Sequence, residues 1–173
     1  MSRRAEIEAL FDSIIAAQGA ALRRVAGIYE RDSGRRDDLF QEICLAIWRA
    51  LPGFRAEASP RTFVFRIAHN RGLTHRWRAR RSAVGSMEEA LDLPDRRPNP
   101  EEAAQAHSDA DRLRAAVHAL PLPIRQAVSL ALEGLTNREI GEVLGISDGN
   151  VAVRLTRGRA LLREALSTRE KRS

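Results

Sequence analysis

The chain lacks several features that would define a secreted or membrane protein. It contains a single cysteine, Cys44, so no internal disulfide can form, and we expect this cysteine to be a small buried residue on a helix. It has no uninterrupted apolar run of the roughly 20 residues that a bilayer-spanning helix requires. Its first residues, MSRRAEIEALFD, have neither the apolar core nor the cleavage site of a signal peptide. These absences predict a protein of the reducing cytoplasm that does not insert into a membrane.

Familiar signatures of catalysis and metal binding are missing as well. The sequence contains no P-loop and no HExxH motif, and its four histidines are scattered. Paired carboxylates occur only where a solvated helix face or a linker is expected. We therefore predict no enzymatic activity, no metal site and no cofactor.

Strand patterns are also scarce. Ala, Leu, Arg and Glu dominate, and alternating runs of β-branched or aromatic residues do not occur. We therefore predict an all-α fold. Helices are expected at about residues 5–29, as one helix or a broken pair, then at 37–51 after a turn at 31–36, at 60–81 and from 106 onward.

The segment at 37–51, DDLFQEICLAIWRAL, has the clearest amphipathic pattern. Leu39, Ile43 and Ile47 recur at helical spacing and predict a buried stripe. The opposite side is polar, and by default a polar helix side is a solvated face.

Charge is distributed unevenly along the chain. The formal net charge is +6, from 29 lysines and arginines against 23 acids. No acid lies between Glu57 and Glu88, acids then prevail up to Asp111, and the last part of the chain is basic again. This order suggests two lobes that face nucleic acid, joined by an acidic connection. We predict two small helical domains at 1–81 and 106–173, with a flexible acidic linker at 82–105.

The segment at 136–166 has the pattern of a helix-turn-helix. Thr136 and Glu139 form a T-x-x-E capping box that starts the first helix. Gly145 suits the left-handed end of that helix, and Ser147 can cap the next one. An ordinary α-hairpin is the alternative interpretation, but the caps, the glycine and the arginines occur together. The second helix is expected to bury Val151, Leu155, Gly158, Leu162 and Leu166.

One face of this second helix is suited to reading DNA. Asn150, Val153, Arg154 and Arg157 recur at helical spacing and can lie in a major groove. Asn150 can pair with adenine, and Val153 can touch a thymine methyl group. Arg159 lies further round the helix and suits a phosphate contact.

The helix at 60–81 carries a basic stripe, which consists of Thr62, Arg66, His69, Arg76 and Arg80. A solvated face is the ordinary interpretation of such a stripe, but the lack of acids and the interleaved aromatic residues favour nucleic acid. Aromatic rings can stack on an unpaired base, which contributes about 1–3 kcal/mol per base. The candidate rings are Phe54, Phe63, Phe65 and Trp77, most of which are expected in the core.

Two parts of the chain, in this order, resemble bacterial sigma factors. DDLFQEICLAIWRAL and SPRTFVFRIAHNRGLTHRWRAR resemble sigma domain two, and LPLPIRQAVSLALEGLTNREIGEVLGISDGNVAVRLTRGRALLREAL resembles sigma domain four. The short linker, with no domain three, is similar to the extracytoplasmic-function subfamily. The resemblance covers about residues 8–168.

The resemblance implies a subunit that binds core RNA polymerase, at the β′ clamp helices and the β flap, and directs it to promoter DNA. It also implies an anti-sigma partner. The implied polymerase contacts are Asp38, Gln41 and Glu42. The predicted −10 contacts are Phe54, Arg55, Arg61, Thr62, Arg66, His69, Arg76 and Arg80. The predicted −35 contacts are Arg138, Ser147, Asn150, Val153, Arg154, Arg157 and Arg159.

The sequence also departs from the family pattern. Phe63 stands where the family often has Trp, and Asn150, Ala152 and Val153 stand where it often has Thr, Lys and Ser. No promoter sequence is therefore transferred. A stand-alone helix-turn-helix regulator of duplex DNA would explain 136–166 but not DDLFQE or the basic helix. A protein-interaction module sequestered by a partner is a further alternative.

Overall fold

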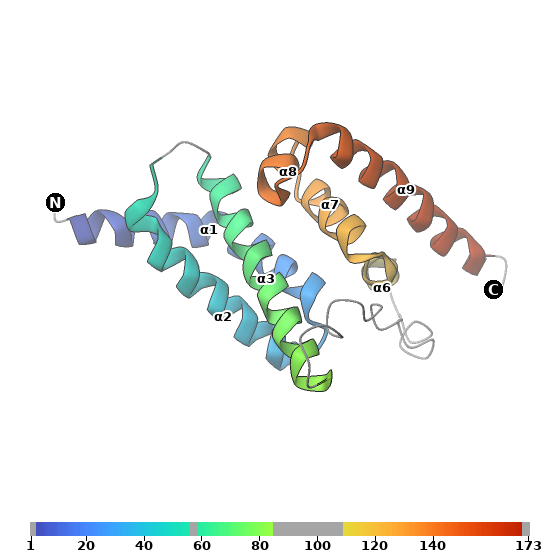
Figure 1. Ribbon diagram of the computed structural model, residues 1–173, viewed down its shortest axis with the longest axis horizontal. Helices are drawn as coiled ribbons and strands as arrows, with labels where there is room; N and C mark the ends of the chain where they lie inside the picture. The colour runs from blue at the N-terminus through green and yellow to red at the C-terminus, as the bar shows by residue number, and fades with distance from the viewer. Residues whose placement is uncertain (1–2, 56–58, 85–108, 171–173) are drawn as a thin grey trace. The chain divides into compact units, whose positions relative to one another are not determined.

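The computed structural model describes residues 3–55, 59–84 and 109–170. The chain divides into two compact units, Met1–Leu91 and Asp92–Ser173, which we term the N-terminal and C-terminal lobes. Every regular element in the described ranges is a helix, which confirms the predicted all-α fold (Figure 1). None of these helices combines the length and the apolar character needed to cross a bilayer. The linker predicted at 82–105 lies largely outside the described residues.

Long helices build the N-terminal lobe, and each of them packs against the other two. They are α1 (Arg3–Tyr29), which is continuous rather than a broken pair, α2 (Ser33–Ala50) and α3 (Pro60–Val84), with the 3-10 turn η1 (Leu51–Gly53) after α2. The prediction of a turn at 31–36 is largely wrong because Asp32 caps α2. Its carboxylate accepts a hydrogen bond from the Arg35 backbone N–H at 2.9 Å, so α2 begins at Ser33.

The interior of the N-terminal lobe confirms the stripe predicted for α2. Leu39, Ile43 and Ile47 are fully buried. Gly72 lets α3 pack closely against the Tyr29 ring of α1, since a Cβ built there would lie 2.2 Å from Cδ2 of Tyr29. Cys44 is half-buried rather than fully buried, and burial raises the pKa of its thiol.

The C-terminal lobe consists of shorter helices and one long one. They are α6 (Asp109–Ala119), α7 (Leu122–Leu132), α8 (Asn137–Leu144) and α9 (Asp148–Glu170). The last helix packs against the other three. Val151 and Leu155 are buried as predicted. Gly158 allows α7 to pack closely against α9, because a Cβ at this position would lie 2.5 Å from Cγ2 of Val128.

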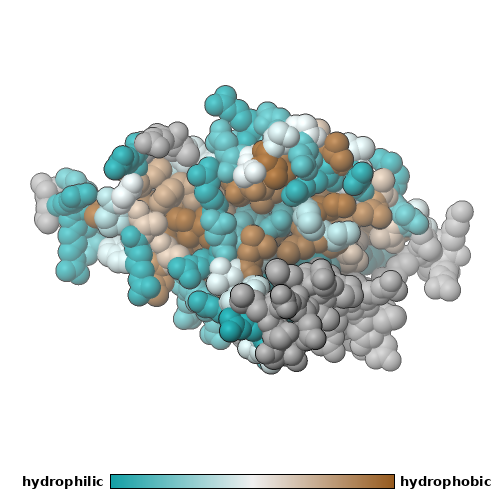
Figure 2. All heavy atoms as spheres, in the orientation of Figure 1, coloured by the Kyte–Doolittle hydropathy of each residue, from teal (hydrophilic) through white to brown (hydrophobic). Residues whose placement is uncertain are grey.

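The buried stripe of α9 is shorter than predicted. Leu162 is only half-buried and Leu166 is 41% exposed, so both predictions of burial are wrong. The reason is that α9 runs to Glu170, whereas α7 has only 11 residues. The end of α9 therefore extends beyond the helices that cover its first turns. Hydrophilic and apolar residues are interspersed on the face drawn in Figure 2, and Leu45, Leu132 and Val153 are the most exposed large apolar side chains described.

Candidate nucleic-acid interface

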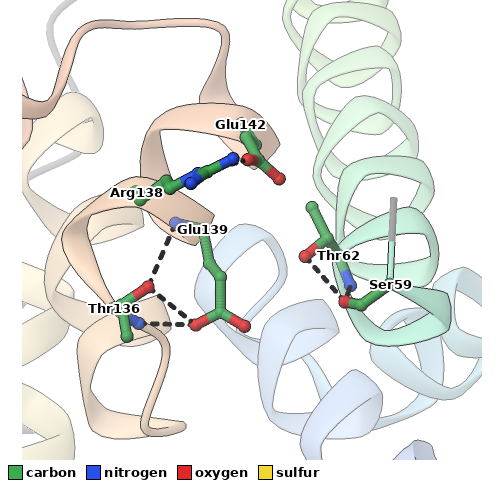
Figure 3. Close-up of polar contacts among 6 residues, drawn as sticks. All are labelled: Ser59, Thr62, Thr136, Arg138, Glu139 and Glu142. Carbon is green, nitrogen blue, oxygen red and sulfur yellow. Dashed lines mark hydrogen bonds and ion pairs between the residues drawn. The ribbon is translucent and has the colours of Figure 1, made fainter. Parts of the chain in front are cut away.

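The start of the helix-turn-helix is fixed by the predicted capping box, which is confirmed (Figure 3). The Thr136 backbone N–H donates to Glu139 Oε2 at 2.7 Å, and the Glu139 backbone N–H donates to Thr136 Oγ1 at 3.3 Å. Each side chain thus satisfies a backbone donor that the helix itself leaves without a partner. Arg138, on the exposed side of the same turn, donates from Nε to Glu142 Oε1 at 3.2 Å.

The turn between α8 and α9 also follows the prediction. Gly145 has φ 68° and ψ 36°, the left-handed conformation that a residue with a Cβ adopts at a cost. Ser147 accepts a hydrogen bond from the Asn150 backbone N–H at 3.3 Å and so caps α9. Gly141 makes the turn tight, because a Cβ there would lie 2.7 Å from the backbone oxygen of Ile146. These contacts set the direction in which α9 leaves the turn.

The face of α9 that adjoins its buried stripe is open to solvent. Asn150 and Arg157 are exposed there, and Val153 is 50% exposed; Arg159 is also exposed, but further round the helix. Arg154 is half-buried at the border of this face. The structure therefore brings together the polar and small apolar side chains that the sequence placed in a major groove.

Arg154 makes contacts that the sequence did not reveal. Its Nε donates to Asn150 Oδ1 at 3.0 Å, and its Nη1 makes a long hydrogen bond of 3.5 Å to the backbone carbonyl of Pro123 in α7. Helical spacing could have suggested the first contact, since the two residues are four positions apart. Nothing in the sequence indicates the contact with Pro123, because every residue has a backbone carbonyl and the residue type does not show which one accepts a hydrogen bond.

The basic stripe on α3 is only partly exposed. Arg66 is exposed, and Arg61, Arg76 and Arg80 are half-buried. Thr62 and His69 are each only 1% exposed, so the prediction that they contact DNA is wrong. They lie in the first and third turns of α3, on the side that packs against the rest of the lobe.

Both buried residues have internal roles. Ser59 accepts from the Thr62 backbone N–H at 3.1 Å and lies 3.0 Å from its hydroxyl, which confirms Ser59 as the cap of α3 (Figure 3). His69 Nδ1 lies 2.6 Å from the Tyr29 hydroxyl. Burial lowers the pKa of His69 to about 3, so the ring is neutral near pH 7 and offers no charge to a phosphate.

A pair of rings stands beside the loop that precedes α3. Phe54 and Phe63 are both half-buried, with centroids 4.8 Å apart and planes inclined at 46°. The neighbouring Arg55 is exposed. Phe65 is fully buried and is not available for stacking. The rest of the predicted loop, residues 56–58, lies outside the described residues.

The outer face of α2 carries the residues predicted to meet a protein partner. Asp38, Gln41 and Glu42 are all exposed, on the side opposite the buried stripe. Glu42 Oε2 lies 4.0 Å from Nη1 of Arg78 on α3, and both side chains are largely open to water. Leu45, which sequence reasoning did not single out, is 47% exposed in the same region of α2.

A second polar contact joins the end of α1 to α3 and was also missed. Glu30 Oε2 lies 3.0 Å from His75 Nε2, with both side chains mostly buried. Burial alone would raise the pKa of the Glu30 carboxyl, but hydrogen bonds from His75 and the backbone N–H groups of Asp32 and Arg31 outweigh it and hold that pKa below its usual value. Across the described ranges, no group of three His, Cys, Asp or Glu residues is placed to hold a metal ion.

Comparisons with known proteins match both lobes separately. The family model described as Sigma-70 region 2 matches residues 14–82, and the one described as Sigma-70, region 4 matches residues 110–162. The ECF RNA polymerase sigma factor ShbA of Streptomyces griseus is 36% identical over 132 residues, which cover 73% of this chain and 68% of that protein.

A second relative is similar in both sequence and structure. The RNA polymerase sigma factor CnrH of Cupriavidus metallidurans is 30% identical over 164 residues, which cover 88% of this chain and 84% of that protein. A solved structure of CnrH in complex with the cytosolic domain of CnrY superposes with a TM-score of 0.66 at 25% identity, over 93% of this chain and 90% of that one.

Proposed function

The chain belongs to the extracytoplasmic-function (ECF) RNA polymerase sigma factors, and from this we propose that its two lobes divide promoter recognition between them. The N-terminal lobe binds core RNA polymerase and the opened −10 element, and the C-terminal lobe binds the −35 element as duplex. The observation that carries the proposal is the ordered presence of regions 2 and 4 in one chain. A stand-alone helix-turn-helix regulator does not account for region 2.

The exposed face of α2 is the proposed polymerase surface. Asp38, Gln41 and Glu42 point away from the core of the lobe and offer carboxylates and an amide to a partner helix pair, the β′ clamp helices. Leu45 adds an apolar contact within the same region. Complementary charges at such an interface fix orientation and speed association, and a reversed charge there opposes binding. The C-terminal lobe would meet the β flap.

The proposed −10 site is formed by the Phe54–Phe63 pair and the arginines near it. A base that leaves the duplex loses stacking worth a few kcal/mol, and an aromatic platform offsets that loss. Arg55 and Arg66, both exposed, would hold the phosphates of the same strand, with Arg61, Arg76 and Arg80 at the border of the surface.

The proposed −35 site is the solvent face of α9 with the start of α8. Asn150, Val153 and Arg154 would face base edges, while Arg157 and Arg159 would contact phosphates, as would Arg138 and Ser147 at the two helix starts. Each lobe alone then makes few base contacts. Joint attachment to polymerase makes the second contact effectively intramolecular, which raises the total affinity.

Control by a protein partner is part of the proposal. Because the relative CnrH has been solved in complex with the cytosolic domain of CnrY, we expect this chain to be held by an anti-sigma factor when it is not needed. The chain would act in the cytoplasm, with catalysis supplied entirely by the polymerase. Purification of the chain from uninduced cells should recover such a partner, and recovery of polymerase alone counts against it.

In vitro transcription tests the function itself. Core polymerase mixed with the purified chain is expected to initiate at a defined set of promoters, whose upstream sequences share two elements at fixed spacing. Core polymerase alone provides the control. If the chain neither binds core polymerase nor changes its start sites, the proposed function is wrong.

A further inference from the structure

The contact between Asn150 and Arg154 limits what Asn150 can do. Arg154 donates from Nε to Asn150 Oδ1 at 3.0 Å. A guanidinium carries donors only, so it is the amide oxygen, not the NH2 group, that Asn150 must turn toward Arg154. The NH2 group of Asn150 is then left for other partners.

Arg154 is held at a second point as well. Its Nη1 reaches the backbone carbonyl of Pro123 at 3.5 Å, and the side chain is half-buried, whereas Val153 and Arg157 on the same helix are exposed. A side chain with restrained rotamers loses less entropy when it meets a ligand. Arg154 is therefore better ordered in advance than the other arginines of this face.

The amide oxygen of Asn150 can accept two hydrogen bonds, but a paired contact with adenine requires the amide group to lie in the plane of the base, whereas the hydrogen bond from Arg154 holds it along the helix. Paired contacts to adenine need the oxygen to accept from N6 and the NH2 group to donate to N7. Adenine pairing would thus compete with the hydrogen bond to Arg154. Arg154 keeps further N–H donors on its Nη atoms, and donors in a planar fork match N7 and O6 of guanine.

We propose that Asn150 is a positioning residue for Arg154, and that the pair selects guanine in the −35 duplex instead of Asn150 selecting adenine. This proposal rests on the proposed promoter-binding function of the C-terminal lobe. It makes the preference at one base pair depend on two residues, only one of which touches the guanine.

The test uses the full chain assembled with core polymerase and duplexes randomised across the −35 region, which are sequenced after binding. The wild-type complex is expected to enrich guanine at one position by roughly tenfold, as a paired arginine contact allows. Arg154→Ala abolishes this enrichment. Asn150→Ala weakens the same guanine preference and leaves the other positions unchanged. The proposal is overturned if Asn150→Ala instead removes a preference for adenine while the guanine preference persists.

Asn150→Asp distinguishes positioning from direct reading. Aspartate keeps an acceptor oxygen for Arg154 but lacks the NH2 donor that adenine N7 requires. The guanine preference should be retained, with affinity lowered for all sequences by the added negative charge. Loss of the guanine preference in this variant overturns the proposal.

Arg157→Ala is the matched control on the same face of α9. It should lower affinity for all sequences by a similar factor and leave the base profile unchanged, because a phosphate contact carries no sequence information. A wild-type complex that enriches no sequence overturns the proposed function and this proposal together. Wild-type enrichment that Asn150→Ala leaves intact overturns this proposal alone.

Discussion

The two lobes differ in the side chains they can offer to nucleic acid. The five phenylalanines, two tryptophans and one tyrosine of the chain all lie in the N-terminal lobe, and no Phe, Trp or Tyr follows Trp77. Unpaired bases need a π-face to stack on, whereas a duplex is read by polar and small apolar groups in a groove. The composition of each lobe thus suits a different form of DNA, opened strand for the first and duplex for the second.

The interiors of the two lobes also differ in their content of aromatic side chains. The N-terminal lobe buries the Tyr29–His69 pair against Gly72, and the helix-turn-helix packs through aliphatic residues such as Ile140, Val151 and Leu155. The difference is useful experimentally. Trp48 and Trp77 both belong to the N-terminal lobe, so tryptophan fluorescence follows the unfolding of that lobe, while far-UV circular dichroism follows both.

The largest expected effect on stability is that of Gly72→Ala. The new Cβ would fall 2.2 Å from a Tyr29 ring whose hydroxyl is bonded to His69, so the ring cannot move without losing that bond. We expect the free energy of unfolding to fall by about 3 kcal/mol, which is at the upper end of the effects of overpacking a core. The loss should appear in urea unfolding followed by tryptophan fluorescence.

Gly19→Ala is the control for this substitution on α1. Its Cβ would meet Ile15 Cγ2 at 3.5 Å, an ordinary contact, so alanine should stabilise the lobe by up to about 1 kcal/mol. If the two alanine variants shift the unfolding midpoint in the same direction, the close approach of α1 and α3 is not as described.

Acid should weaken the N-terminal lobe through His69. Burial lowers its pKa to about 3 in the folded lobe, while the unfolded chain binds the proton near pH 6.5. The unfolded state therefore binds more protons between these values, and stability falls as pH falls from about 6.5 toward 3. We expect a loss of about 2 kcal/mol between pH 7 and pH 5, measured by urea unfolding at each pH.

His69→Gln keeps an acceptor for the Tyr29 hydroxyl but does not titrate in this range. The variant should show a flatter pH dependence between pH 7 and pH 5. Glu30 does not account for that interval, because its carboxyl pKa lies below the usual 4.5 and its contribution is lost only in stronger acid. A wild-type slope in His69→Gln would exclude His69 as the source.

Substitutions at the helix caps should have the smallest effects on stability, and each should destabilise only the lobe that contains it. Ser59→Ala removes the acceptor for the Thr62 N–H, and Thr136→Ala opens the box with Glu139. Each substitution should lower the free energy of unfolding by about 1 kcal/mol. Fluorescence should report the loss for Ser59→Ala and not for Thr136→Ala, whereas circular dichroism should report both. An effect of Thr136→Ala on fluorescence would mean that the lobes do not unfold independently.

Local chemistry explains why much of the helix-turn-helix was predictable from sequence. A capping box, a left-handed glycine and a buried stripe all depend on residues within a few positions of one another. The exposure of Asn150, Val153 and Arg157 followed from the same periodicity. Periodicity could not predict where the buried stripe of α9 ends, because the burial of Leu166 depends on how far α7 extends alongside α9.

Prediction was weaker on α3, where the pattern is ambiguous. Thr62 and His69 share a stripe with arginines, and a polar residue on a basic stripe is expected to face water. Both are buried because each has an internal partner, Ser59 for one and Tyr29 for the other. The second partner is 40 positions away in the chain, so helical spacing cannot reveal it.

The division of labour between the lobes is tested most directly by two variants compared in two assays. Glu42→Arg reverses a charge on the proposed polymerase surface, and Arg154→Ala removes the ordered guanidinium of the proposed −35 site. Affinity for core polymerase and, at saturating chain, affinity of the complex for promoter DNA are measured for both. Glu42→Arg should lower only the first affinity and Arg154→Ala only the second. Equal losses for both variants in both assays would show that the lobes do not act separately.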